Sequence, residues 1–282
     1  MQLPDNLMIL TDLDGSLLDH HSYDWQPAAI WLDNLRTSGI PVIPNTSKTA
    51  AELATLREEL GLEEMPCVVE NGGLVLLPPS WRMMADPDQS SDGWTRIVLG
   101  ASYERILEVL STMKGRPGID FTGFSEMGVS GVSETTGLPM DKARQAHARE
   151  ASEPLLWHGD AKGLAMFQQA LADQGLALTR GGRFYHVTGK TSKGVALVWL
   201  AGRFEQRFGQ QPHTLAFGDG ANDLPMLAAA RTGVLIRGAV YQPDLPQTMD
   251  DPSRLYVTRA EGPAGWVEGV EYWLAHGLGV SQ

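Results

Sequence analysis

Two aspartates follow the first apolar segment of the chain, and their spacing favours chemistry with a cation. Asp12 and Asp14 come directly after the apolar run at residues 7–11, and side chains two positions apart on an extended segment point the same way. Such carboxylates repel each other unless a cation or a shared proton relieves them, and Mg²⁺ suits hard oxygen ligands. Gly15 permits a turn, and the hydroxyl and N–H of Ser16 could contact a phosphate. The alternative is an ordinary acidic turn.

Three further polar segments lie at the end of an expected strand or the start of an expected helix. They are Asn45-Thr46-Ser47-Lys48, Thr191-Ser192-Lys193-Gly194, and Gly218-Asp219-Gly220-Ala221-Asn222-Asp223. A lysine at a helix start is unfavourable to the helix dipole, so Lys193 fits a cation beside Asp12 and a phosphate better than a solvated side chain. Strand ends of this kind are where open α/β sheets build active sites.

In this order the four segments resemble the motifs of the haloacid dehalogenase superfamily of phosphohydrolases. The resemblance implies that Asp12 attacks phosphorus to give an aspartyl-phosphate. It implies that Asp14 protonates the leaving oxygen and then activates water, and crowded negative charge favours the proton that Asp14 must hold. It also implies an Mg²⁺ held by Asp12, the Asp14 backbone carbonyl and Asp219, with Asp223 orienting the metal shell. Asn222 either caps the next helix or holds the lysine of the third motif and a metal-bound water.

The second segment offers groups for the phosphate and the substrate. Thr46 follows a strand, so its hydroxyl and backbone N–H could both bind a phosphoryl oxygen. The alternative is a capping role, but Thr49 is the better cap because it forms a capping box with Glu52. We expect Ser47 and Lys48 to be secondary substrate contacts. Asn45 departs from the superfamily pattern, which more usually has an apolar residue at this position.

The elements that position these groups alternate between strand and helix at both ends of the chain. Expected strands lie at residues 7–11, 40–44, 67–69, 74–77 and 214–217, and expected helices at 27–39, 49–61, 190–207 and 265–275. Residues 82–187 read instead as a separate α+β unit, with strands near 94–99, 154–157, 176–180 and 183–187 and helices near 106–113, 133–150 and 160–174. We therefore predict an α/β fold: a Rossmann-like parallel-sheet core from residues 1–81 and 188–282, with an inserted α+β cap at 82–187, as in the large-cap (Cof-like) subgroup.

Parts of the chain resemble one branch of the superfamily, the mannosyl-3-phosphoglycerate phosphatases. These parts are residues 21–27, 137–139, 149–154 and 180–186. The resemblance implies a Mg²⁺-dependent phosphatase that converts 2-O-mannosyl-3-phosphoglycerate into mannosylglycerate. The same chemistry on another sugar phosphate, such as the glucosyl analogue, is a near alternative. A sugar phosphomutase is a different one, and a non-catalytic sensor would be expected to lose a catalytic residue, which this chain does not.

A substrate of this kind carries a phosphate, a carboxylate and hydroxyl groups, and the insertion offers donors for them. Gly181 and Gly182 let backbone N–H groups approach an oxyanion, and Arg183 and His186 add side-chain donors. The alternatives are a surface strand arginine and a structural histidine. Adjacent histidines in an extended loop diverge, so we interpret His20 and His21 as surface residues and not as a metal pair.

Composition excludes several classes of partner. The chain has 282 residues, with 22 Lys and Arg against 34 Asp and Glu, a formal net charge of −12. This acidic balance argues against nucleic acid or an anionic membrane as the main partner. The single cysteine, Cys67, cannot form an internal disulfide, which fits a reducing cytoplasm. With no leader or membrane span expected, we predict a cytoplasmic enzyme whose partner is a small phosphorylated glycoside, with no obligate protein partner.

Overall fold

A computed structural model of the chain describes residues 4–181, 183–238, 243, 245, 249, 251 and 253–277. Its central sheet has five parallel strands in the order β12-β11-β10-β1-β2. The strands are β1 (Leu7–Thr11), β2 (Val42–Pro44), β10 (His213–Gly218), β11 (Thr232–Arg237) and β12 (Leu255–Glu261). This confirms the predicted parallel-sheet core, although β11 and β12 were not among the predicted strands.

Helices cover both faces of this sheet. They are α1 (Ala29–Thr37), α2 (Ala50–Glu59), α7 (Lys193–Phe208), α8 (Leu224–Ala229) and α9 (Gly262–Ala275). Successive residues of a strand point to opposite faces, and Leu7 and Ile9 of β1 accordingly join the apolar cluster that includes α1 and α9. Met8 and Leu10 join the cluster on the α7 and α8 side. The strand is therefore buried on both faces, as a central parallel strand should be.

The register of the sheet brings three of the sequence motifs together at the carboxyl ends of neighbouring strands. Thr11 at the end of β1 pairs with Pro44 of β2 on one side and with Phe217 of β10 on the other. The chain segments that leave these strands therefore emerge side by side. They carry Asp12, Thr46 and Asp219.

A second, antiparallel sheet of three strands lies beside the core. It consists of β3 (Cys67–Val69), β4 (Leu74–Leu77) and β5 (Thr95–Val98), and a turn at Glu70–Gly72 joins its first two strands. The start of the inserted unit predicted at residue 82 is too early, because β5 pairs with β4. The physical reason is that Ile97 and Leu99 pack against the apolar cluster on the α7 and α8 side of the central sheet, so this strand belongs to the core.

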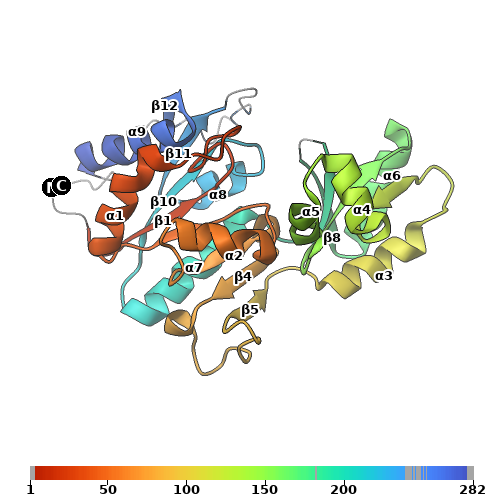
Figure 1. Ribbon diagram of the computed structural model, residues 1–282, viewed down its shortest axis with the longest axis horizontal. Coiled ribbons are helices and arrows are strands. Elements are labelled where there is room, and N and C mark those ends of the chain that lie inside the picture. The colour runs from red at the N-terminus through yellow and green to blue at the C-terminus, as the bar shows by residue number, and fades with distance from the viewer. Residues whose placement is uncertain are drawn as a thin grey trace.

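The inserted unit forms the second lobe of the molecule, with helices α3 to α6 around their own sheet (Figure 1). Its antiparallel sheet has the order β6-β7-β9-β8. The strands are β6 (Phe121–Gly123), β7 (Ser152–Trp157), β8 (Leu176–Arg180) and β9 (Tyr185–Gly189), and the helices are α3 (Tyr103–Met113), α4 (Phe124–Thr136), α5 (Met140–His147) and α6 (Ala161–Asp173). The predicted α+β cap is thus present.

Two details of the cap differ from the sequence-based expectation. The single helix expected near residues 133–150 is the end of α4 followed by α5, because Gly137 adopts a left-handed conformation (φ 80°) and Pro139 precedes the new helix. The strand β6 was not predicted.

The two chain segments that connect the core with the cap lie in close contact. A Cβ atom on Gly189 in one segment would lie 2.2 Å from the backbone nitrogen of Ala101 in the other. None of the described helices is both long and apolar enough to cross a membrane.

Candidate active site

The structure brings Lys193 and Asp12 together at the carboxyl end of β1, in the interior of the central sheet. Lys193 is the first residue of α7, whose N-cap Ser192 accepts a hydrogen bond from the N–H of Val195. The Lys193 Nζ donates to Asp12 Oδ1 at 2.7 Å and to Asp223 Oδ1 at 2.6 Å. Its side chain is fully buried. The ammonium therefore works as a fixed point charge between two carboxylates.

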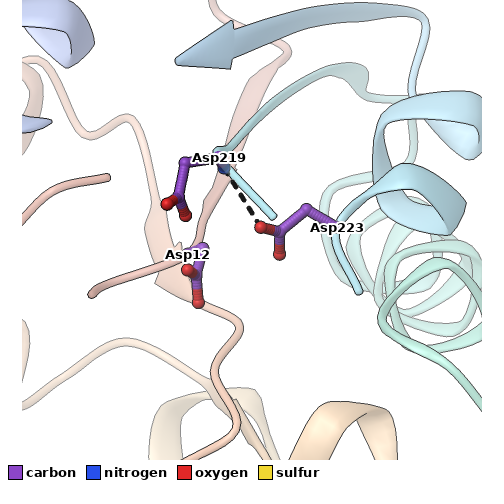
Figure 2. A group of neighbouring side chains, drawn as sticks. All are labelled: Asp12, Asp219 and Asp223. Carbon is purple, nitrogen blue, oxygen red and sulfur yellow. Dashed lines mark hydrogen bonds between the residues drawn. The ribbon is translucent and has the colours of Figure 1, made fainter. Parts of the chain in front are cut away.

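The acidic loop after β10 is organised around Asp223. Its Oδ2 accepts hydrogen bonds from the backbone N–H groups of Asp219 (3.1 Å) and Gly220 (2.9 Å). Both oxygens of Asp223 are thus engaged by the protein. Figure 2 shows the carboxylate of Asp219 directed toward Asp12, with the Asp219 backbone bound to Asp223. Asp223 accordingly holds the loop that presents Asp219.

These three aspartates form a donor set that suits a divalent cation. One oxygen each from Asp12, Asp219 and Asp223 lie within 4.8 Å of one another. Burial, followed by the neighbouring carboxylates, raises the pKa of Asp219 and of Asp223. Three carboxylates against the one ammonium of Lys193 leave an excess of two negative charges, which a divalent ion would neutralise. The all-oxygen character of the set fits Mg²⁺.

Ser16 serves this acidic group directly. Its hydroxyl donates to Asp219 Oδ1 at 3.3 Å, and its backbone N–H donates to the Leu13 carbonyl. The expectation that these two groups contact a phosphate is therefore wrong, because both are used inside the protein. Gly15 has φ +81°, and a Cβ there would lie 2.5 Å from Asp219 Oδ2, so only glycine allows this turn to approach Asp219.

Asp14 pairs with the lysine of the second motif. The Lys48 Nζ lies 2.8 Å from Asp14 Oδ2, while Oδ1 is buried without a hydrogen-bond partner among the described residues. Burial raises the pKa of Asp14, Lys48 opposes this rise, and Asp12 adds to it. The net upward shift favours the protonated form that a general acid needs. Lys48 was predicted to contact substrate, but the structure places it against Asp14.

Thr46 and Asn45 are held from both sides by hydrogen bonds. The backbone N–H of Thr46 donates to the Val68 carbonyl, so the predicted use of that N–H for a phosphoryl oxygen is wrong. Its hydroxyl oxygen accepts from the N–H of Lys48 at 3.2 Å, which leaves the hydroxyl proton free to donate. The Asn45 amide donates to the Lys193 carbonyl at 3.0 Å. This polar residue therefore ties the second motif to the third.

A cavity of about 720 Å³ lies between the core and the cap at the carboxyl end of β1. The core side contains five of the predicted site residues and the cap side two. The lining residues are Asp12, Asp14, His20, Ser47, Asn71, Asp219, Gly220, Ala221 and Asn222 of the core, and Thr179, Arg180, Gly181 and His186 of the cap. The Asn222 amide donates to Asn71 Oδ1 at 3.2 Å. The cavity therefore joins the acidic cluster to the tip of the cap hairpin.

The cap hairpin presents Arg180 to the cavity instead of Arg183. Arg180 ends β8 and pairs with Tyr185 of β9. Arg183 lies exposed in the hairpin turn, where its Nη1 donates to the Thr135 carbonyl. Gly182, which we predicted to contact substrate, lies outside the described residues. The pairing of Thr179 with His186 across the hairpin could have identified Thr179, since residues paired across neighbouring strands lie on one face.

His186 enters the cavity as a neutral side chain. Burial, with a smaller contribution from Arg149, lowers the pKa of His186 to about 4. Its Nδ1 is buried with no hydrogen-bond partner in the described part of the chain. His186 therefore suits a hydroxyl group better than a carboxylate. His20, expected at the surface, is exposed but lines the cavity as well.

Comparison with known proteins relates the whole arrangement to one group of enzymes. The model of the haloacid dehalogenase-like hydrolases matches residues 9–242. The structure of the phosphatase BT1666 from Bacteroides thetaiotaomicron is similar with a TM-score of 0.65 and 19% identity, over 97% of this chain and 96% of that one. The sugar phosphatase BT4131 gives a TM-score of 0.62 with 15% identity, over 97% and 100% of the two chains. The sucrose-phosphatase from Synechocystis, in complex with sucrose and phosphate, gives 0.58 with 16% identity, over 95% and 98%. At these identities the likeness establishes the fold.

Proposed function

This chain belongs to the haloacid dehalogenase-like hydrolases, and from that premise we propose that it is a Mg²⁺-dependent phosphatase that uses Asp12 as its nucleophile. The observation that carries the proposal is the buried contact between Lys193 and Asp12 beside two further aspartates. Phosphate-ester hydrolysis through an aspartyl-phosphate needs a carboxylate nucleophile and positive charge beside the phosphoryl oxygens. The same site contains both.

The reaction needs two displacements at phosphorus. Lys193 holds Asp12 Oδ1, which leaves Oδ2 to form a bond to phosphorus while the ester P–O bond breaks. Asp14 gives its proton to the departing oxygen and later takes a proton from the attacking water. The bond from Asp12 to phosphorus then breaks, which releases phosphate and restores both carboxyl groups. Thr46 donates its hydroxyl proton to a phosphoryl oxygen.

The metal would be held by Asp12, Asp219 and the backbone carbonyl of Asp14, with Asp223 fixing the loop that carries Asp219. Bound there, Mg²⁺ supplies positive charge to the phosphoryl oxygens as negative charge develops. The excess of carboxylates over ammonium groups at the site supports this assignment. Removal of metal by a chelator should therefore abolish hydrolysis, and Mg²⁺ should restore it.

We propose that the substrate is a phosphorylated glycoside, and specifically 2-O-mannosyl-3-phosphoglycerate. Among the described cap residues that line the cavity, Arg180 supplies the positive charge, and Thr179 and the neutral His186 supply polar groups. One cation with neutral donors suits a molecule that carries a carboxylate and sugar hydroxyls. The names of two similar structures, a sugar phosphatase and a sucrose-phosphatase, point to the same substrate class. We also propose that the enzyme acts in the cytoplasm, a reducing compartment that suits a chain whose single cysteine, Cys67, cannot form an internal disulfide.

A phosphate-release assay with the purified full chain tests this substrate. The panel contains 2-O-mannosyl-3-phosphoglycerate, its glucosyl analogue, sucrose 6-phosphate and 3-phosphoglycerate, each with Mg²⁺. We expect kcat/KM to be highest for the mannosyl compound, by about tenfold or more over 3-phosphoglycerate, which corresponds to about 1.4 kcal/mol of added binding from the sugar. Equal rates on all four compounds would contradict the substrate proposal, and an isomerised product without free phosphate would indicate a mutase.

A further inference from the structure

A cap arginine makes a direct contact with the loop that carries Thr46. Arg149 follows α5, and its Nη1 donates to the Ser47 carbonyl at 3.0 Å across a sequence separation of 102 residues. Its Nε donates to the Ala146 carbonyl at 2.9 Å, which fixes the side chain against the end of α5. Arg149 does not line the cavity that contains Asp12. Besides its electrostatic effect on His186, Arg149 reaches the cavity through the carbonyl of Ser47, which is a lining residue.

The peptide unit that Arg149 holds is the one that orients the Thr46 hydroxyl. The Ser47 carbonyl and the Lys48 N–H belong to the same planar peptide. Arg149 binds that carbonyl, and the N–H of Lys48 donates to Thr46 Oγ1 at 3.2 Å. Because this bond occupies an acceptor position of the hydroxyl, the hydroxyl proton must point elsewhere. A cation on the carbonyl also polarises the peptide and strengthens its N–H as a donor.

The same loop is attached to the cap at further points. The Thr49 hydroxyl donates to the Gln145 carbonyl at 2.8 Å. The Lys48 carbonyl accepts from the N–H of Glu70 at 2.9 Å, and Glu70 is itself fully buried. The Glu70 carboxylate accepts from three groups of the cap segment after Arg149, namely the N–H groups of Glu150 (2.8 Å) and Ala151 (3.1 Å) and the hydroxyl of Ser152 (2.6 Å). The loop at residues 46–48 and this cap segment thus form one hydrogen-bonded unit.

We propose that Arg149 is a positioning residue that aims the Thr46 hydroxyl at the phosphoryl group. Arg149 fixes the peptide between Ser47 and Lys48, this peptide fixes the hydroxyl, and the hydroxyl binds the phosphoryl oxygen. The seating of the cap is thereby coupled to phosphate binding, even for a substrate too small to touch the cap. The proposal rests on the phosphatase function proposed above.

A double-mutant cycle tests this chain of contacts. The variants are Arg149→Met, Thr46→Val and the two combined, and the readouts are kcat/KM on p-nitrophenyl phosphate and the affinity for inorganic phosphate by calorimetry. We expect Thr46→Val to lower kcat/KM by about 30- to 100-fold and Arg149→Met by about 10-fold, with a double variant no worse than Thr46→Val alone. Phosphate affinity should follow the same pattern. Arg144→Met, at an exposed arginine of the same helix, is the matched control and should match the wild type.

Two results would overturn the positioning role. Losses that multiply in the double variant would show that Arg149 and Thr46 act independently, and an Arg149→Met variant with wild-type kcat/KM would show that Arg149 does not act at all. If Arg149→Met does not fold, Arg149→Lys replaces it in the same cycle. A wild-type protein that binds phosphate but hydrolyses nothing would contradict the phosphatase function, while the calorimetric cycle would still decide the role of Arg149.

Discussion

Lys193 lies 2.7 Å from Asp12 although 181 positions separate them in the chain. Burial alone would lower the pKa of Lys193, but Asp12 and Asp223 offset this effect and raise it. The lysine is therefore a permanent cation at the end of β1. The parallel register of β1 and β10 and the start of α7 together place this charge beside Asp12, the proposed nucleophile.

We predict that Lys193→Met removes activity and also destabilises the fold. Two carboxylates, Asp12 and Asp223, would lose a fully buried partner, and an uncompensated buried charge costs about 3 kcal/mol or more. Turnover of p-nitrophenyl phosphate should fall by about 10²-fold or more. Urea unfolding in a chelator and steady-state kinetics measure the two effects, with the exposed Lys190→Met as control. An unchanged free energy of unfolding would show that the ammonium does not compensate these carboxylates.

We predict that Asp219→Asn separates metal binding from fold stability. The variant should need about tenfold or more Mg²⁺ for half-maximal activity, because a neutral amide is a weaker ligand. Without metal it should be at least as stable as the wild type, since burial, together with repulsion from Asp12 and Asp223, disfavours the charged form of Asp219. Magnesium titrations of activity and thermal unfolding in a chelator give both values, with the exposed Asp120→Asn as control. A Mg²⁺ midpoint equal to that of the wild type would remove Asp219 from the ligand set.

We predict that two arginines of one hairpin differ sharply in their effect on the substrate. Both side chains are exposed, but Arg180 lines the cavity, whereas Arg183 donates to the Thr135 carbonyl. Arg180→Ala should lower kcat/KM on 2-O-mannosyl-3-phosphoglycerate by about 10²-fold, as for loss of a charge-assisted contact. Arg183→Ala should change it by less than about threefold. Neither variant should affect p-nitrophenyl phosphate much. A larger loss for Arg183→Ala than for Arg180→Ala would reverse the assignment.

His213, far from the catalytic groups in the fold, should make the protein sensitive to acid. It is almost fully buried and its Nε2 lies 3.0 Å from the Thr232 hydroxyl. Burial, with Arg231, lowers the pKa of His213 from 6.5 to about 4. At pH values between these two, His213 binds a proton in the unfolded chain but not in the folded protein. Its contribution to the free energy of unfolding is therefore fully present above pH 6.5 and is lost as the pH falls toward 4.

The variant His213→Gln tests this pH dependence, because glutamine can keep the bond to Thr232 but does not titrate. We compare free energies of unfolding in urea at about pH 7.5 and pH 4.5, and the wild type should lose about 1 to 2 kcal/mol more than the variant on acidification. Equal losses would show that His213 takes up its proton in the folded protein as readily as in the unfolded chain.

Local patterns in the sequence predicted much of the fold. The capping box of Thr49 and Glu52 is present, and the apolar run at residues 7–11 is the buried central strand. These features depend on neighbours along the chain. The pairing of β5 with β4 depends on contacts made after a long loop, so the sequence did not reveal it.

In the candidate site, too, some features follow from the local sequence and others depend on contacts between distant segments. The types of the candidate catalytic residues follow from the motifs, but their hydrogen bonds do not. Whether the Thr46 N–H faces a phosphate or the Val68 carbonyl depends on how β3 lies beside β2, and the pairing of Lys48 with Asp14 depends on two loops that meet only in the folded protein. The choice between Arg180 and Arg183 depended on the exact position of a hairpin turn.

The most direct test of the account is a burst experiment with Asp14→Asn on p-nitrophenyl phosphate. p-Nitrophenolate leaves without a general acid, so Asp12 should still be phosphorylated, whereas the water step should slow because its base is missing. We predict a burst approaching one p-nitrophenolate per active site, followed by slow turnover, and no burst when Asp12→Asn is added. Slow hydrolysis by Asp14→Asn without a burst or protein-bound phosphate would contradict an aspartyl-phosphate at Asp12.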